Sequence, residues 1–270
     1  MSEPAGLRVV PAPNPSPMTL DGTRTYLVGH ARPVVIDPGP ALDGHVRAVL
    51  EALGGVRPEA ILLTHSHADH SGAAPALAER TGAPVLMARG ALASRVPAGA
   101  VGRWIGEGDE VETDAGTLRA LATPGHAPEH LAFVWRQGNA VFVGDHLMGE
   151  GDTSLVAPPE GDLAAYLESL RRIGEAGAEV LYPAHGPPIR DVAAAVERYA
   201  EHRRTRVEQV RAALRDGAAT PAGLVRRVYG PELHPGLAAA AEGSLRAVLA
   251  YLEGRGEVRR GLLGRYRRVR

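Results

Sequence analysis

The residues best suited to chemistry stand in one short run, from Thr64 to His70. This run contains four ligand-type residues, His65, His67, Asp69 and His70. Imidazole nitrogen and carboxylate oxygen are the ligands that zinc takes in the absence of sulfur, and the chain has no cysteine. Four such residues at this spacing are improbable in an incidental surface loop, so the run predicts a metal site.

Three further candidate ligands stand alone, each just after an apolar run. They are His126 in the sequence TPGH, Asp145 in the sequence VFVGD, and His185 in the sequence YPAH. Open α/β sheets place their sites where strands end, and a neighbouring glycine or proline shapes the turn. Any one of the three could be structural. Together with the first run, they predict one metal site built at several strand ends.

The elements that must position these residues alternate along the first 190 residues. Short apolar runs predict strands at Thr25–Val28, Val34–Ile36, Ala60–Leu63, Pro84–Met87, Thr117–Leu121, Leu131–Trp135, Ala140–Val143 and Val180–Leu181. Apolar residues at helical spacing predict helices at 46–53, 73–80 and 163–173. Ser71 and Asp162 are expected to cap the second and third of these helices. Helices that fall between strands predict sheets covered by helices, a mixed α/β fold.

After about residue 190 the strand signals stop until the C-terminal end. We expect helices at Val192–Leu214, Pro221–Val228 and Leu237–Leu252, followed by a hairpin of Glu257–Arg260 and Arg265–Val269. Three helices and a hairpin, in this order, are typical of a winged-helix module. The sequence therefore predicts two domains, a catalytic domain at 1–195 and a winged-helix-like domain at 196–270.

Composition narrows the setting of the protein. Without cysteine, the chain has no disulfide, thiolate ligand or cysteine nucleophile. The N-terminal residues contain no apolar run like that of a signal peptide, and no stretch approaches the roughly 18 apolar residues of a membrane span. We therefore expect a cytoplasmic protein with no membrane partner, and leave a homodimer open.

Charge is distributed unevenly along the chain, whose net charge is −1. All thirty basic residues are Arg. Residues 201–270 hold fifteen of them against seven acids, a charge of +8, and residues 1–200 hold fifteen against twenty-four acids, a charge of −9. Clustered arginines attract phosphate backbones; those expected to form such clusters are Arg203, Arg204, Arg206 and Arg211 on one helix and Arg259, Arg260, Arg265, Arg267 and Arg268 on the hairpin. The alternative interpretation is that these arginines pair with the acidic catalytic domain.

At the candidate ligands, the sequence resembles hydrolases of the metallo-β-lactamase fold. The pattern His65-x-His67-x-Asp69-His70, followed by His126, Asp145 and His185, matches the family's signature in order and spacing. The resemblance covers residues from about 20 to 190 and implies an αβ/βα sandwich with the site at one edge of two sheets. It also implies three sets of metal ligands: His65, His67 and His126 for a first ion, Asp69, His70 and His185 for a second, and Asp145 as a bridge between them.

Two ions held close together would supply the chemistry. They can share a water and lower its pKa towards neutrality, which gives a bridging hydroxide as the nucleophile. We expect zinc, although the same ligands accept iron or manganese. The expected catalytic residues are Asp145, the bridge, and Asp69, which could orient the hydroxide or shuttle a proton. The sequence thus predicts a dinuclear metal-dependent hydrolase.

The substrate is less constrained than the metal site. Motifs at 149–153, 157–162, 182–187 and 202–204 resemble the bacterial relatives of the mitochondrial β-lactamase-like endoribonuclease, which cleaves single-stranded RNA. The same subgroup includes thioesterases that act on carrier proteins. The Arg-rich tail favours RNA as the substrate. The alternative enzyme class is a thioesterase, either glyoxalase II-like or acting on an acyl-carrier thioester.

Two features bear on these alternatives. A thioesterase would need an apolar channel beside the metals, which Leu147, Met148, Leu155 and Val156 could line, although they could equally be core residues. A third interpretation is a protein that binds nucleic acid or a partner while its metal site is vestigial. The intact ligand set argues against that interpretation.

Several histidines fall outside the signature. His30, His45 and His234 have no motif around them and are expected at the surface. His130 and His146 lie near the ligands in sequence and could contact ligands or substrate, or simply fill space. We favour His146 because it follows Asp145 directly.

Overall fold

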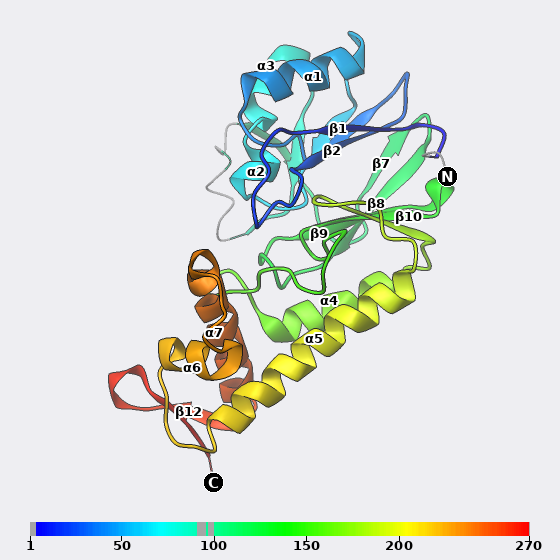
Figure 1. Ribbon diagram of the computed structural model, residues 1–270. Helices are drawn as coiled ribbons and strands as arrows, with labels where there is room; N and C mark the ends of the chain where they lie inside the picture. Colours follow the sequence, from blue (N-terminus) through cyan, green and yellow to red (C-terminus); the bar gives the residue numbers. More distant parts are fainter. Residues whose placement is uncertain (1–3, 91–95, 97–99, 270) are drawn as a thin grey trace.

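Two β-sheets lie face to face, with helices on their outer sides, in the computed structural model, which describes residues 4–90, 96 and 100–269 (Figure 1). The first sheet has the order β1-β2-β3-β4-β5-β6 and the second the order β11-β10-β9-β8-β7. This mixed α/β sandwich confirms the fold expected from the sequence.

The first sheet consists of β1 (Leu7–Pro11), β2 (Arg24–Val28), β3 (Val34–Ile36), β4 (Ala60–Leu62), β5 (Val85–Met87) and β6 (Val101–Trp104). Strands β3 to β6 run parallel, and β1 to β3 are antiparallel. Helices α1 (Asp43–Leu53) and α3 (Ala74–Thr81) follow β3 and β4, with the short α2 (Ala68–Ser71) before α3. Side chains alternate across β3, so that Val34 and Ile36 pack between the sheets while Val35 packs in the cluster beneath α1 and α3.

The second sheet consists of β7 (Glu110–Thr113), β8 (Gly116–Ala122), β9 (Leu131–Trp135), β10 (Ala140–Gly144) and β11 (Val180–Pro183). A 3-10 turn at Arg136–Gly138 joins β9 to β10. Strands β7 to β10 are antiparallel, and β10 and β11 are parallel. Strands β8, β10 and β11 therefore point the same way, and their carboxyl ends lie at one edge. Helices α4 (Leu163–Glu175) and α5 (Val192–Ala213) cover the outer face.

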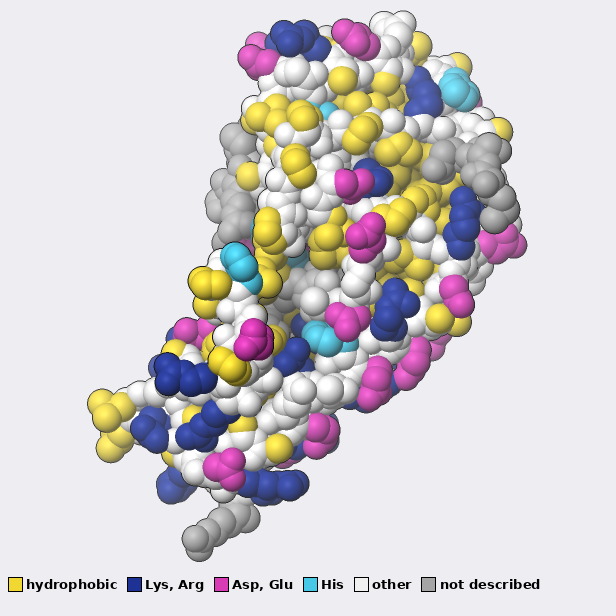
Figure 2. All heavy atoms as spheres, in the orientation of Figure 1, with side chains coloured by type: hydrophobic (Ala, Val, Ile, Leu, Met, Phe, Trp, Pro, Cys, Tyr) yellow, Lys and Arg dark blue, Asp and Glu magenta, His cyan; other side chains and the backbone are white. Residues whose placement is uncertain are grey.

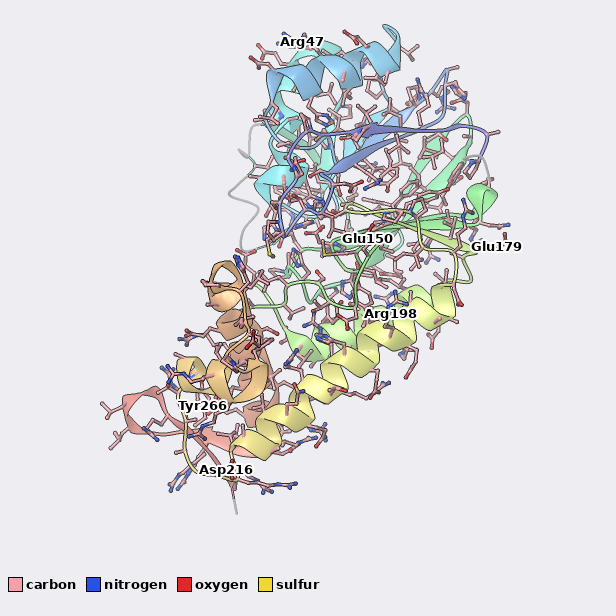
Figure 3. All side chains as sticks on the ribbon, viewed as in Figure 1. Arg47, Glu150, Glu179, Arg198, Asp216 and Tyr266 are labelled. Atoms are coloured by element: carbon pink, nitrogen blue, oxygen red, sulfur yellow. The ribbon has the colours of Figure 1, made fainter. Side chains whose placement is uncertain are left out.

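The C-terminal segment continues from α5 into α6 (Pro221–Tyr229), a 3-10 turn (Pro235–Leu237), α7 (Ala238–Gly254) and the hairpin strands β12 (Val258–Arg260) and β13 (Tyr266–Arg268), with a further 3-10 turn at Leu262–Gly264. The three predicted helices and the hairpin are thus present, while the winged-helix arrangement stays a prediction. The hairpin carries Tyr266, labelled in Figure 3.

The C-terminal helices share a core with the second sheet. Leu170 of α4, Tyr199 of α5 and Leu249 of α7 belong to the same buried cluster as Val141 of β10. The domain boundary expected at residue 195 falls inside α5. Figure 3 labels Arg198 on this helix, and its Nε donates a hydrogen bond to the carbonyl of Gly151 in the loop after β10. Helix α5 therefore joins the tail to the sandwich.

Two local expectations need correction. Ser71 does not cap α3: it ends α2, and its hydroxyl donates to the carbonyls of Ser66 and His67 at 3.0 Å, while Ala73 occupies the cap position. Strands β1, β6 and β7 were not predicted. Each lies at the edge of its sheet, where charged and exposed residues replace the apolar run that marks an inner strand.

Within the described residues, no helix is both long enough and apolar enough to cross a membrane.

The Asp114 carboxylate links the two sheets through hydrogen bonds to the turn between β2 and β3. This residue lies in the turn between β7 and β8, and its carboxylate accepts hydrogen bonds from the backbone N–H groups of His30, Ala31 and Arg32, at 2.9, 2.9 and 3.0 Å. Those three residues form the turn between β2 and β3 of the other sheet. The backbone donors lower the pKa of Asp114 to about 2.

Replacing Asp114 by Asn should lower the stability of the protein at neutral pH, because the amide cannot accept all three hydrogen bonds. The pKa in the folded protein lies below the unfolded value of about 3.9. The stabilisation is therefore complete above about pH 4 and is lost as the pH falls towards about 2. Urea unfolding followed by circular dichroism across this range should show the wild type and Asp114→Asn converging. A difference that stays constant with pH would contradict the charge-based explanation.

Candidate metal centre

All seven candidate ligands lie where strands end at the same edge of the sandwich. His65 and His67 follow β4, and Asp69 and His70 lie in α2 just beyond them. His126, Asp145 and His185 follow β8, β10 and β11, the strands of the second sheet that share one direction. The two sheets thus bring their loops to a common site, which local sequence spacing alone would not do.

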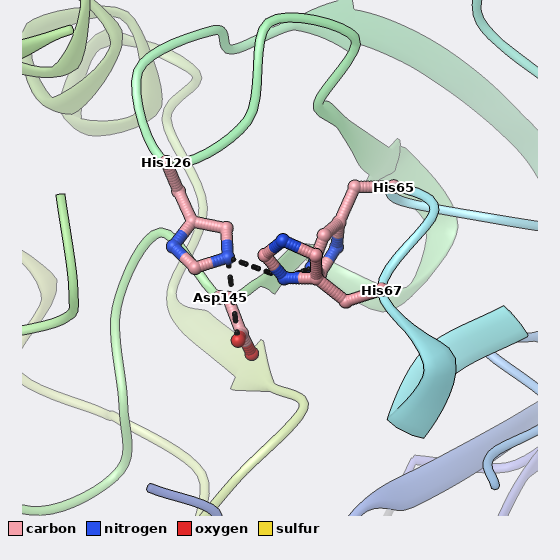
Figure 4. A group of neighbouring side chains, drawn as sticks. All are labelled: His65, His67, His126 and Asp145. Atoms are coloured by element: carbon pink, nitrogen blue, oxygen red, sulfur yellow. Dashed lines mark hydrogen bonds and ion pairs between the residues drawn. The ribbon is translucent and has the colours of Figure 1, made fainter. Parts of the chain in front are cut away.

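The first group of ligand atoms comes from His65, His67, His126 and Asp145 (Figure 4). The Nδ1 atom of His67 lies 2.8 Å from Nε2 of His65 and 3.0 Å from Nε2 of His126. Nε2 of His126 lies 3.6 Å from Oδ2 of Asp145. One atom from each of the four residues lies within 4.8 Å of the others.

The second group comes from Asp69, His70, His185 and again Asp145. Oδ1 of Asp145 lies 3.2 Å from Nε2 of His70 and 3.1 Å from Nε2 of His185. Oδ2 of Asp69 lies 3.6 and 3.4 Å from the same two nitrogens. Asp145 therefore contributes one oxygen to each group, the position expected of a bridge.

These spacings fit ions between the ligands. A tetrahedral ion with bonds of about 2.0–2.1 Å places its ligand atoms about 3.3 Å apart. The observed separations lie around that value. Oδ1 of Asp145 and the Nε2 atoms of His70 and His185 are buried, and despite their closeness none has a hydrogen bond of acceptable geometry among the described residues. Oδ1 of Asp145 lies within 3.2 Å of both nitrogens, so these residues fit a cation.

The other nitrogen of each histidine contacts a protein acceptor. The acceptors are Oγ1 of Thr64 for His65, Oε2 of Glu160 for His67, Oδ2 of Asp37 for His70, the carbonyl of Leu155 for His126 and the carbonyl of Gly22 for His185. A nitrogen that donates a proton outward leaves its ring partner unprotonated for an ion. The protein thereby selects the tautomer in which each inward nitrogen is a ligand.

Asp37 and Glu160 are supporting residues that sequence reasoning missed. Asp37 is buried, and its carboxylate accepts hydrogen bonds from the backbone and hydroxyl of Thr64, at 2.8 and 2.7 Å, and from His70, at 2.9 Å. It directly follows strand β3 and so carried the same strand-end signal as the ligands. Glu160, 2.7 Å from His67, had no comparable signal.

Two glycines let the loops approach this closely. Gly144, just before Asp145, has a φ of 51°, and a Cβ there would lie 2.6 Å from Nε2 of His130. Gly125, just before His126, has a φ of 136°, and a Cβ there would lie 2.3 Å from the Cα of Tyr166. Both positions require glycine because of the backbone conformation and the lack of space.

Charge within the site sets the protonation of the second group. Burial lowers the pKa of His185, but the charge of Asp145 outweighs it and raises the pKa to about 9. Burial also lowers the pKa of His70, but the charges of Asp145 and Asp37 outweigh this effect. The pKa of His70 therefore lies well above its usual range. Burial holds the pKa of His65 well below that range. Metal binding at the second group must therefore release protons, and it should weaken as the pH falls.

Among the histidines outside the ligand groups, His30 and His234 are exposed as expected, whereas His45 and His146 are placed differently from expectation. His45 is buried, not at the surface, and its Nε2 lies 2.9 Å from Oγ1 of Thr25. His146, which we favoured as a contact to ligands, stacks on Tyr166 with ring centroids 4.3 Å apart, and burial lowers its pKa to about 3. His130 is the one that lies against a ligand ring, 5.3 Å from that of His65. Although His146 follows Asp145 directly in sequence, its ring packs on Tyr166.

A sandwich of two sheets with a His- and Asp-rich site at one edge defines a class of hydrolases. A family model described as the metallo-beta-lactamase superfamily matches residues 18–185, and the chain belongs to this superfamily. The resemblance noted in the sequence is thereby confirmed.

Known proteins are similar over most of the chain. The atrochrysone carboxyl ACP thioesterase of Aspergillus chevalieri is 37% identical over 224 residues, which cover 82% of this chain and 69% of the relative. The beta-lactamase-like protein 2 homolog of Caenorhabditis elegans is 33% identical over 207 residues, 73% of this chain and 67% of the relative. The crystal structure of a beta-lactamase domain protein from Burkholderia ambifaria matches with a TM-score of 0.85 and 26% identity, over 100% of this chain and 93% of that one. The structural match thus includes the C-terminal helices.

Asp37→Asn and Glu160→Gln should each weaken binding at a different ligand group. Loss of a supporting carboxylate costs about 10–100-fold in metal affinity. Asp37→Asn should act on the group of His70, and Glu160→Gln on the group of His67. Competition with a chelating dye, with bound ions counted by atomic emission, measures both effects.

The matched control is Glu79→Gln, which changes an exposed carboxylate on α3. It should bind ions as the wild type does. Equal weakening of both ions in each of the two test variants would contradict the separate roles of Asp37 and Glu160.

Proposed function

We propose that the protein is a dinuclear metal-dependent hydrolase that acts on acyl thioesters. The proposal rests on one observation above others, the two groups of ligand atoms that share Asp145. Ligands of nitrogen and oxygen favour zinc, and iron or manganese would use the same ligands. We assign the first ion to His65, His67 and His126 and the second to Asp69, His70 and His185, with Asp145 common to both.

Asp145 and Asp69 have distinct tasks in such a reaction. When bound, two divalent ions supply an acidified water and polarise the thioester carbonyl. Asp145 keeps the two groups at a fixed separation. Asp69 is the most exposed carboxylate of the site, with a side chain 30% exposed; its Oδ2 faces the histidines, which leaves Oδ1 to hold or pass a proton. Hydrolysis forms a carbon–oxygen bond, breaks the carbon–sulfur bond and releases a thiol and an acid.

The choice of a thioester over RNA is supported first by the relatives. A protein that is 37% identical is named an ACP thioesterase. It is supported also by the arginines of α5, which were expected to form a phosphate-binding row. Arg203 is buried and donates to the carbonyl of Ser154. Arg204 and Arg211 form ion pairs with Glu197, Glu201, Glu208 and Glu257. These pairs lie within the C-terminal segment, not with the acidic catalytic part.

Single-stranded RNA remains the second candidate because of the hairpin. Arg259, Arg260, Arg265, Arg267 and Arg268 are all exposed on β12, β13 or the turn between them. Leu262 and Leu263 at the tip are 90% and 91% exposed. Figure 2 shows dark-blue and yellow side chains close together at this end of the molecule. A patch of this kind could attract a phosphate backbone, or another acidic partner.

Metal-loaded wild-type protein should hydrolyse acyl thioesters, and Asp145→Ala should reduce kcat/KM to the level of chelator-treated protein, because both groups lose a ligand. The substrates would be N-acetylcysteamine thioesters, carrier-protein thioesters and a fluorescent single-stranded RNA. His30→Ala removes an exposed histidine outside both groups and should leave turnover unchanged. Thermal unfolding would check that both variants fold.

Cleavage of RNA with thioesters untouched would contradict the thioesterase proposal. In that case Arg259→Gln combined with Arg267→Gln should weaken RNA binding and flatten its dependence on salt, without changing the metal content.

A further inference from the structure

A cavity of about 260 Å³ lies between the sandwich and the C-terminal helices. Its apolar wall includes Met18 from the N-terminal loop, Met148 and Leu155 from the loop after β10, and Leu237 before α7. The sequence had suggested Leu147, Met148, Leu155 and Val156 as a channel lining. Met148 and Leu155 do line the cavity, whereas Leu147 and Val156 are core residues.

The walls of this cavity are the same segments that support the metal ligands. The carbonyl of Leu155 accepts a hydrogen bond from Nδ1 of His126 at 2.7 Å. Ser154, also in the wall, donates from its hydroxyl to the carbonyl of Asp145 at 2.5 Å. On the other side, the loop that carries Met18 continues to Gly22, whose carbonyl lies 3.3 Å from Nδ1 of His185. A molecule in the cavity would therefore contact segments that are hydrogen-bonded to ligands of both groups.

One side of the cavity is cationic. Arg206 on α5 lines it, and its guanidinium lies 4.0 Å from the ring centroid of Tyr229. The guanidinium donates to Oε1 of Gln209 at 2.8 Å and approaches Nε2 of His202 at 3.4 Å. Among residues 4–90, 96 and 100–269, no carboxylate forms an ion pair with it, unlike the neighbouring Arg204. Within the part of the chain that the structure describes, the guanidinium of Arg206 therefore has no carboxylate within ion-pair distance.

Two nitrogen atoms at the cationic side of the cavity also lack hydrogen-bond partners among the described residues. Nε of Arg206 and Nδ1 of His202 are buried, and neither has a hydrogen-bond partner in the described part of the chain. A half-buried guanidinium without a carboxylate is unfavourable by itself. The same group beside an apolar wall is suited to a ligand that is apolar along its length and anionic at its end, because a carboxylate can accept a charge-assisted hydrogen bond from a terminal nitrogen.

We propose that this cavity binds the acyl group of the thioester substrate, and that Arg206 binds a carboxylate at the far end of that acyl group. The proposal rests on the thioesterase function proposed above and adds a substrate class, acyl thioesters with a second, free carboxylate. The apolar chain would lie along the wall that includes Met148 and Leu155, so that binding of the carboxylate by Arg206 would direct the thioester carbonyl towards the two ligand groups. Arg206 is thus a specificity-determining residue outside the catalytic groups.

The test compares two N-acetylcysteamine thioesters of equal chain length, the hexanoyl thioester and the monothioester of hexanedioic acid. Neither contains phosphate, so an effect of Arg206 cannot come from a phosphate on the thiol side. The wild type should prefer the carboxylated substrate in kcat/KM. Arg206→Met should lower kcat/KM for that substrate about 10- to 100-fold, the range for a lost hydrogen bond to a charged group, and should change the hexanoyl thioester little.

The matched control is Arg204→Met, two residues away on the exposed side of α5. It should leave the preference unchanged. Ala240→Phe, which fills the cavity from α7, should slow both six-carbon thioesters and spare the acetyl thioester. Equal loss for both six-carbon substrates in Arg206→Met, or no preference in the wild type, would overturn the proposal while leaving the thioesterase function intact.

Binding separates the two proposals. Non-hydrolysable amide analogues of the same two acyl groups can be titrated calorimetrically, and only the carboxylated amide should bind more weakly to Arg206→Met than to the wild type. If no thioester is hydrolysed but this dependence on Arg206 holds, the proposed function fails and the assignment of the cavity stands. If the wild type binds both amides equally tightly, or if Arg206→Met binds the carboxylated amide as tightly as the wild type does, the assignment of the cavity fails.

Discussion

The Asp145 carboxylate is the group on which the rest of the site depends. It is largely buried, with a side chain 14% exposed, and its two oxygens face different sets of imidazoles. Burial alone would raise the pKa of Asp145, but the neighbouring His70 and His185 hold it well below its usual range. An anion in this position is stable only because both sheets deliver cationic or cation-binding groups to it. The face-to-face packing of the sheets therefore brings together the groups that balance the negative charge of Asp145.

The support of that residue extends outward through hydrogen bonds rather than through apolar contacts. Thr64 illustrates this chain of contacts, because its hydroxyl donates to Asp37 and lies 3.0 Å from Nδ1 of His65. Asp37 in turn contacts His70. Asp37 thereby contacts a ligand of the second group directly, whereas it reaches His65 only through the Thr64 hydroxyl. Such networks favour a single arrangement because every unpaired member would be costly.

The parts of the site that could be predicted are those that a short stretch of sequence encodes. The run from His65 to His70 was recognisable because its residue types and spacing are rare together, and the lone ligands because each follows an apolar strand. Glu160 could not be found in this way, since its contact with His67 spans 93 positions. Inner strands were predicted from apolar runs, whereas the edge strands β1, β6 and β7 lacked them. Of the cavity residues, the sequence identified only Met148 and Leu155, because the cavity forms only where α5 to α7 pack on the sandwich.

Helix α5 connects the metal site with that cavity through residues one turn apart. Arg203 is buried, lies 4.8 Å from the ring centroid of Tyr166 and donates to the carbonyl of Ser154. Ser154 contacts the backbone of Asp145. Arg206, three residues further and on the same side of the helix, faces the cavity. One arginine thus fixes the loop that carries the site, and the other remains available to a ligand. Because both project from one helix, a ligand held by Arg206 would lie one helical turn from the arginine that contacts the loop after Asp145.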